Sequence, residues 1–110
     1  MSRYKDFVKL SVRIPISLKL MIEKRAEANR RSFNQEVVWL LEQGLAGADD
    51  AEPPHEIGGT VILSLRVPAR FREQLEQMAD ESRRSLNQQT LWVLESVLIQ
   101  LRKAEQRSLN

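Results

Sequence analysis

Two segments of the chain alternate polar and apolar residues with a period of two, which is the pattern of a β-strand that buries one face. They are residues 9–15, Lys-Leu-Ser-Val-Arg-Ile-Pro, and residues 62–68, Ile-Leu-Ser-Leu-Arg-Val-Pro. One face carries only apolar side chains, namely Leu10, Val12, Ile14, Leu63, Leu65 and Val67. The opposite face carries Lys9, Ser11, Arg13, Ile62, Ser64 and Arg66. The pattern therefore predicts two strands that pack through one face and expose the other.

Two amphipathic helices are expected after each strand. Pro15 ends the first strand, about residues 8–14, because proline lacks a backbone N–H and suits the first turn of a helix. Apolar residues at three- and four-residue spacing predict a helix over 16–29. Ser32 and Gln35 have the spacing of a capping box, which predicts a second helix over 33–45. The equivalent helices are expected over 69–82 and 86–101, followed by a polar tail over 102–110.

The second half of the chain repeats the first at an offset of 53 residues. Between residues 8–45 and 61–98, 16 of 38 aligned positions are identical. Internal repetition of this kind indicates two copies of one strand–helix–helix unit. Because a lone strand leaves its backbone groups unpaired, the two strands are expected to pair antiparallel. The predicted fold is mostly α, with a two-stranded antiparallel β-ribbon shared by both repeats in one folded unit.

The segment between the repeats differs from them in composition. Residues 46–59 are rich in Pro and Gly, hold four acidic residues and no Lys or Arg, and are typical of a linker. The first repeat is accordingly placed at 1–45, with an arm over 1–7, and the second at 60–110. The formal net charge is +2, so the chain outside the linker carries +6. That basic surface favours a polyanionic partner.

Composition also argues against several classes of function. The chain has no Cys and a single histidine, His55, so thiolate metal sites, histidine clusters and a Ser-His catalytic arrangement are excluded. We therefore expect no enzymatic activity, no metal and no cofactor. No apolar run approaches the roughly 18 residues that cross a bilayer, and a cytoplasmic protein without membrane contact is expected.

Two segments resemble a known family. Residues 10–15, Leu-Ser-Val-Arg-Ile-Pro, and residues 29–36, Asn-Arg-Arg-Ser-Phe-Asn-Gln-Glu, are similar to the ribbon-helix-helix DNA-binding family of the Arc and MetJ repressors. The resemblance covers both repeats, about 76 of 110 residues. Because the motif is usually a homodimer in that family, the tandem copies imply an intramolecular pseudo-dimer that is monomeric in itself. Whether such pseudo-dimers associate further on DNA stays open.

The resemblance implies which residues contact double-stranded DNA. The base-contacting positions correspond to Lys9, Ser11, Arg13, Ile62, Ser64 and Arg66. The phosphate-contacting positions correspond to Arg31, Ser32, Phe33, Asn34, Arg84, Ser85, Leu86 and Asn87. Helix N-termini supply unpaired N–H groups to a phosphate, and a two-stranded ribbon fits the major groove. Because Lys9 differs from Ile62, and Glu36 from Gln89, the expected target is an imperfect palindrome.

Three structural questions stay open at this stage. The turn between the helices places Arg30 and Arg83 where a left-handed residue is common, unless Asn29 takes that conformation. Arg31 either contacts phosphate or forms an ion pair with Glu36. Trp39 and Trp92 either cover the edge of the four-helix core or contact a neighbouring pseudo-dimer on DNA.

The leading functional hypothesis is a transcriptional repressor that binds DNA sequence-specifically through a ribbon in the major groove, in a prokaryotic, plasmid or phage context. One alternative is an accessory protein of plasmid transfer or partition, since TraY-type proteins resemble this tandem arrangement. Others are a DNA-binding antitoxin and an interaction module that does not bind nucleic acid. A target beside a transfer origin, or a co-purifying toxin, would favour the first or the second alternative.

Overall fold

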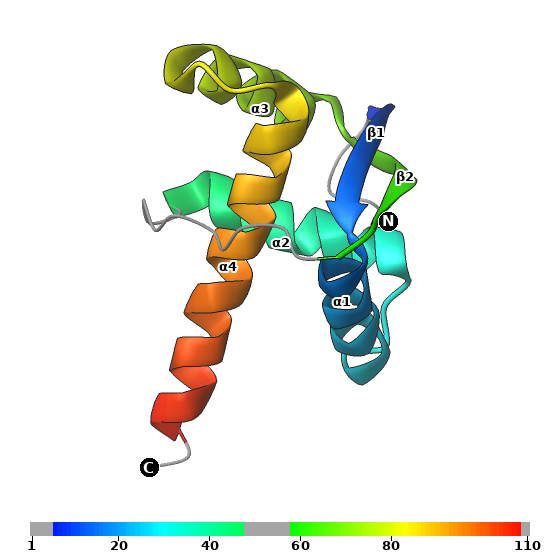
Figure 1. The fold of residues 1–110 in the computed structure, drawn as a ribbon, viewed down its shortest axis with the longest axis vertical. Helices are drawn as coiled ribbons and strands as arrows, with labels where there is room; N and C mark the ends of the chain where they lie inside the picture. The colour runs from blue at the N-terminus through cyan, green and yellow to red at the C-terminus, as the bar shows by residue number, and fades with distance from the viewer. Residues whose placement is uncertain (1–5, 48–57, 109–110) are drawn as a thin grey trace.

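The elements follow the order strand, helix, helix twice along the chain (Figure 1). The computed structural model describes residues 6–47 and 58–108. Their elements are β1 (Phe7–Pro15), α1 (Ile16–Ala28), α2 (Phe33–Gly47), β2 (Thr60–Pro68), α3 (Ala69–Ser82) and α4 (Leu86–Ser108). None of the helices in these two ranges is long and apolar enough to span a membrane.

The two strands pair antiparallel along their whole length, as predicted. Phe7 lies opposite Pro68 and Pro15 opposite Thr60, so Ser11 and Ser64 face each other at the centre. These two serines are equivalent positions of the two repeats. The ribbon is therefore symmetric about its middle, and each strand satisfies backbone groups that the other repeat leaves unpaired.

The inner face of the ribbon closes the hydrophobic core. Its side chains at Leu10, Val12, Ile14, Leu65 and Val67 are no more than 2% exposed, and Leu63 is half-buried. The helices contribute the rest of the core, with Ile22, Leu40, Leu41, Phe71, Leu75 and Leu94 among the most buried side chains. Burying one face fixes the strand register, because a slip of one residue would turn every apolar side chain outward.

Backbone hydrogen bonds extend the ribbon into the helices. The N–H of Ile16, the first residue of α1, donates to the carbonyl of Gly59 at 3.0 Å. The N–H of Ala69, the first residue of α3, donates to the carbonyl of Asp6 at 2.8 Å. Each repeat thus begins its first helix against the residue that precedes the other repeat's strand.

The turns between helices use arginine in the left-handed conformation. Arg30 has φ of 54° and Arg83 has φ of 56°, whereas Asn29 has φ of −92°. A left-handed non-glycine residue costs roughly 1–2 kcal/mol. Each turn is closed by a backbone bond of 2.9 Å, from Arg31 to Ala26 and from Arg84 to Ala79, which satisfies a carbonyl at the helix end.

The last helix is longer than the sequence pattern predicts. The predicted end of this helix at residue 101 was wrong, because α4 continues through Ser108 and the polar residues 102–108 are helical. Residues 102–107 lack apolar periodicity but are mostly good helix formers. Glu105 also lies 3.2 Å from Arg25 of α1, which attaches this end to the first repeat.

The other predicted boundaries shift by small amounts. Phe7, assigned to the arm, begins β1, and residues 46 and 47, assigned to the linker, end α2. The first helix ends at Ala28, one residue before the predicted end. The rest of the predicted arm and linker, residues 1–5 and 48–57, lies outside the described residues, as does His55.

The crossing of α2 and α4 depends on Gly44. A Cβ there would overlap a γ-methyl of Val93 and would lie 2.9 Å from a γ-methyl of Val97. We expect Gly44→Ala to lower the free energy of unfolding by about 1–3 kcal/mol, because the core cannot accept the extra methyl without shifting. Gly47→Ala in the same helix is the control. A Cβ at Gly47 meets nothing within 4 Å, and its change should stay below about 1 kcal/mol. Equal effects of the two substitutions in urea denaturation would contradict this packing.

Candidate nucleic-acid interface

The outer face of the ribbon is an exposed surface of six side chains. The register places Lys9 opposite Arg66, Ser11 opposite Ser64, and Arg13 opposite Ile62. All six are exposed, and the apolar Ile62 is 68% exposed. The structure therefore brings together every residue that the sequence assigned to base contact. One end of this face carries two cationic side chains and the other end carries one beside an apolar side chain.

Two asparagine side chains fasten the second helix of each repeat to the other repeat's strand. The amide of Asn34 donates to the carbonyl of Arg66 and accepts from its N–H, both at 2.8 Å. The amide of Asn87 accepts from the N–H of Arg13 at 2.7 Å and donates to its carbonyl at 3.0 Å. These bonds satisfy the backbone at the ribbon edges and place the N-terminus of α2 beside Arg66 and that of α4 beside Arg13.

The binding of Asn34 and Asn87 to the ribbon backbone, which we call the asparagine clamp, was not anticipated from the sequence. Asn34 and Asn87 were expected among the phosphate-contacting residues, whereas in the structure their side-chain amides bind the ribbon. The one sequence feature that set these asparagines apart was that they occupy equivalent positions of the two repeats. Only the antiparallel register reveals that each faces an arginine backbone across the repeat boundary.

Capping boxes begin both second helices, as predicted. In α2 the hydroxyl of Ser32 accepts from the N–H of Gln35 at 3.1 Å, and the Gln35 side chain accepts from the N–H of Ser32 at 2.9 Å. In α4 the same pair of bonds joins Ser85 and Gln88 at 3.0 and 2.9 Å. Each box satisfies the third N–H of its helix and leaves the first two without an intrahelical acceptor.

The remaining N–H groups flank the ribbon. They belong to Phe33 and Asn34 in α2 and to Leu86 and Asn87 in α4, and within the described ranges no backbone or side-chain acceptor binds them. Adjacent N–H groups at the positive end of a helix dipole suit a phosphate oxygen. The structure therefore places two adjacent N–H groups without a protein acceptor beside each end of the ribbon.

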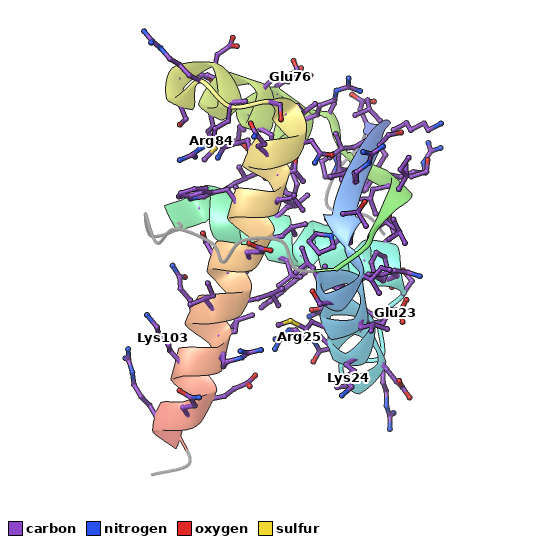
Figure 2. All side chains as sticks on the ribbon, viewed as in Figure 1. Glu23, Lys24, Arg25, Glu76, Arg84 and Lys103 are labelled. Carbon is purple, nitrogen blue, oxygen red and sulfur yellow. The ribbon has the colours of Figure 1, made fainter. Side chains whose placement is uncertain are left out.

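A buried carboxylate lies behind the start of α2. Glu36 is fully buried, and its Oε1 accepts from Asn29 Nδ2 and Arg31 Nη1, each at 3.1 Å. Its Oε2 lies 3.7 Å from Arg25 Nε, and Arg25 also reaches Glu105 of α4. Figure 2 shows Arg25 on the side of α1 that faces α4. Two cations and an amide thus compensate a charge that would otherwise be costly to bury. Of the two alternatives given for Arg31, the structure shows the ion pair with Glu36.

The start of α4 is built differently. Gln89, the equivalent of Glu36, is 2% exposed and accepts from Arg84 Nη1 at 3.1 Å. The Arg84 guanidinium also lies 3.7 Å from the ring centroid of Trp92, compared with 4.9 Å for Arg31 above Trp39. Both tryptophans are half-buried, and Trp39 packs against the core. Each ring therefore supports an arginine at a helix start.

Arg72 adds a support that no sequence pattern indicated. Its Nη1 donates to the carbonyl of Lys9 at 2.9 Å, and its Nε pairs with Glu76 at 2.9 Å. The equivalent Lys19 pairs with Glu23 at 3.3 Å on its own helix. Arg72 therefore braces the end of the ribbon that carries Lys9 and Arg66. Over the described residues, no group of three His, Cys, Asp or Glu side chains is placed to hold a metal ion.

The asparagine clamp gives a stability prediction. Asn34→Ala or Asn87→Ala removes two hydrogen bonds and leaves a ribbon N–H and carbonyl without their partner. We expect each to lower the free energy of unfolding by about 1–3 kcal/mol in urea denaturation. Gln74→Ala, which removes an exposed amide from α3, is the control and should stay within about 0.5 kcal/mol. A clamp variant no different from the control would mean that these bonds do not hold the ribbon.

One comparison with known proteins finds a similarity that covers the first repeat. Residues 3–48 match the family model of the Arc-like DNA binding domain. No curated protein and no solved structure matches the chain. The matched range holds β1, α1 and α2, which supply one strand of the ribbon and one of the two capped helix starts. Over residues 3–48 the chain is therefore similar to Arc-like DNA binding domains, which have the ribbon-helix-helix fold.

Proposed function

We propose that this chain binds double-stranded DNA sequence-specifically by inserting the β1–β2 ribbon into the major groove. The observation that carries the proposal is the exposed outer face of the ribbon, flanked at each end by a helix start with unused N–H groups. The ribbon would contact base edges while the helix starts contact phosphates on either side. The family match over residues 3–48 supports DNA as the partner.

We propose further that one chain forms the complete binding unit, as an intramolecular pseudo-dimer. The second repeat has the same order of elements and its own capping box, and it supplies the strand that pairs with β1. The bonds of Asn34 and Asn87 both cross between the repeats. Neither repeat thus completes the interface without the other.

The target would be an imperfect palindrome. Arg66 with Lys9 at one end can donate to guanine O6 and N7, whereas at the other end Arg13 lies beside Ile62. Ile62 has no hydrogen-bonding side chain and suits an apolar contact such as a thymine methyl. The two half-sites would therefore differ at the base pairs that these residues contact.

The biological role that we prefer is repression of transcription by occupying a promoter, in the prokaryotic cytoplasm. An accessory role in plasmid transfer or partition uses the same interface, and no described contact favours it. The antitoxin alternative uses the same interface as well, and no described contact favours it. Association of neighbouring chains on DNA through Trp39 and Trp92 stays a proposal, since each ring already supports an arginine.

Binding-site selection from random duplexes, followed by affinity measurements on the selected site, tests this function. The wild type should enrich a motif with two unequal halves. Arg66→Ala should weaken binding to that motif by about 1–3 kcal/mol and relax the sequence requirement at one position. Arg107→Ala removes the same charge near the end of α4, which points away from the ribbon in Figure 1, and should keep the sequence preference. A perfectly palindromic motif, or an equal loss of specificity in both variants, would contradict the proposal.

A further inference from the structure

The two helix starts beside the ribbon differ in charge although their backbones match. We call Arg25, Arg31, Glu36 and Glu105 the first corner, and Arg84, Gln89 and Met78 the second corner. In the first corner two arginines pair with two glutamates, at N–O distances of 3.1 to 3.7 Å. The formal charges in the first corner therefore cancel.

The second corner keeps its positive charge. Met78 is the equivalent of Arg25, and Gln89 is the equivalent of Glu36. Both groups that the structure places on the Arg84 guanidinium, the Gln89 amide oxygen and the Trp92 ring, are neutral. Within the described residues no carboxylate lies in ion-pair range of Arg84.

This difference bears on phosphate binding. A phosphate that approaches Arg31 competes with a fully buried carboxylate already 3.1 Å away, and in a poorly solvated site that attraction is weakly screened. Arg84 has no such competitor. Its guanidinium is held against Trp92 and Gln89, so little side-chain freedom is lost when its remaining N–H groups bind a phosphate.

The ribbon shows the opposite distribution of charge. Asn34 places the neutral first corner beside Arg66, whose cross-strand neighbour is Lys9. Asn87 places the cationic second corner beside Arg13, whose neighbour is Ile62. The ribbon end with two cations thus adjoins the neutral corner, and the end with one cation adjoins the charged corner.

We propose that the two ends of the interface bind DNA in different ways, and that Glu36 and Gln89 set the difference. The Lys9–Arg66 end relies on the cations of the ribbon, and its helix start contributes mainly backbone N–H groups. The Arg13–Ile62 end relies on Arg84, which supplements the N–H groups of α4 as the principal phosphate ligand. The chain would therefore bind its target in one orientation, with the more tightly clamped backbone beside the Ile62 end. This inference rests on the DNA binding proposed above.

Gln89→Glu in the full chain tests the role of the second corner. It changes one atom of a buried side chain and gives Arg84 a carboxylate partner like that of Arg31. Affinity for a random-sequence duplex is measured by fluorescence anisotropy across a salt series. Affinity falls as salt rises, and losing one phosphate contact makes the slope of log affinity against log salt shallower by about 0.9. This corresponds to roughly eightfold weaker binding near 0.1 M salt. A lower slope here means a shallower one. We expect a change of that size.

Two further variants separate a local effect from net charge. Gln106→Glu makes the same chemical change on an exposed residue near the end of α4. It should leave the slope within about 0.3 of the wild type, because no described contact joins Gln106 to either corner and this end of α4 points away from the ribbon. Glu36→Gln gives the first corner the side chain that the second repeat already buries. It frees Arg31 and should steepen the slope, by up to about 0.9.

If Gln89→Glu does not fold, the role of the second corner can still be tested with a second variant. The double variant Met78→Arg, Gln89→Glu copies Arg25 and Glu36 into the second corner at unchanged net charge, so a lower slope in it is a local effect. Thermal unfolding followed by circular dichroism identifies folded variants. If neither Gln89→Glu nor the double variant is folded, the slope of Glu36→Gln alone tests the inference.

The possible outcomes separate failure of this inference from failure of the proposed DNA binding. If the wild type binds no duplex at any salt concentration, the proposed DNA binding is wrong. If the wild type binds, but Gln89→Glu and Gln106→Glu lower the slope equally, or Glu36→Gln leaves it unchanged, the DNA binding stands and the division between the two ends is wrong. A lower slope for Gln89→Glu alone, with a steeper slope for Glu36→Gln, supports it.

Discussion

The antiparallel pairing of β1 and β2 is the constraint on which the rest of this structure depends. Each repeat supplies one strand, and a single strand has no partner for its backbone N–H and C=O groups and offers too little apolar surface to cover the helices. Pairing solves both problems at once, because the joined inner face covers the four helices and the core fixes the register. Asn34 and Asn87 then bind the ribbon edges, so that the second helices are fastened to the strands as well as packed beneath them.

The same constraint builds the candidate interface. Pairing about the central serines turns all six outer side chains to one surface, and the two asparagines set a capped helix start beside each end of that surface. The symmetry is a property of the backbone and is not shared by the side chains. Lys9 and Ile62, Glu36 and Gln89, and Arg25 and Met78 occupy equivalent positions with different chemistry. A symmetric scaffold thus carries an asymmetric surface, which is the physical basis for proposing unequal half-sites.

Much of this architecture follows from the sequence because its signals are local and repeated. Period-two alternation located the strands, Ser32 and Gln35 located a helix start, and the 53-residue offset indicated that the strands pair with each other. Features that depend on tertiary contact did not follow. The clamp of Asn34, the brace from Arg72 to Lys9 and the helical end of α4 at Glu105 each join residues distant in sequence. Whether Arg31 contacts phosphate or Glu36 stayed open, because its place just before α2 in the sequence allows both.

An amide NMR titration with a selected duplex tests whether the outer face of the ribbon and the two capped helix starts contact DNA. The largest chemical-shift changes are expected at residues 9–13 and 62–66 and at the N–H groups of Phe33, Asn34, Leu86 and Asn87. Small changes are expected along α1 and the C-terminal half of α4. Changes concentrated on those helices, with the ribbon amide shifts unchanged, would mean that DNA does not bind at the ribbon.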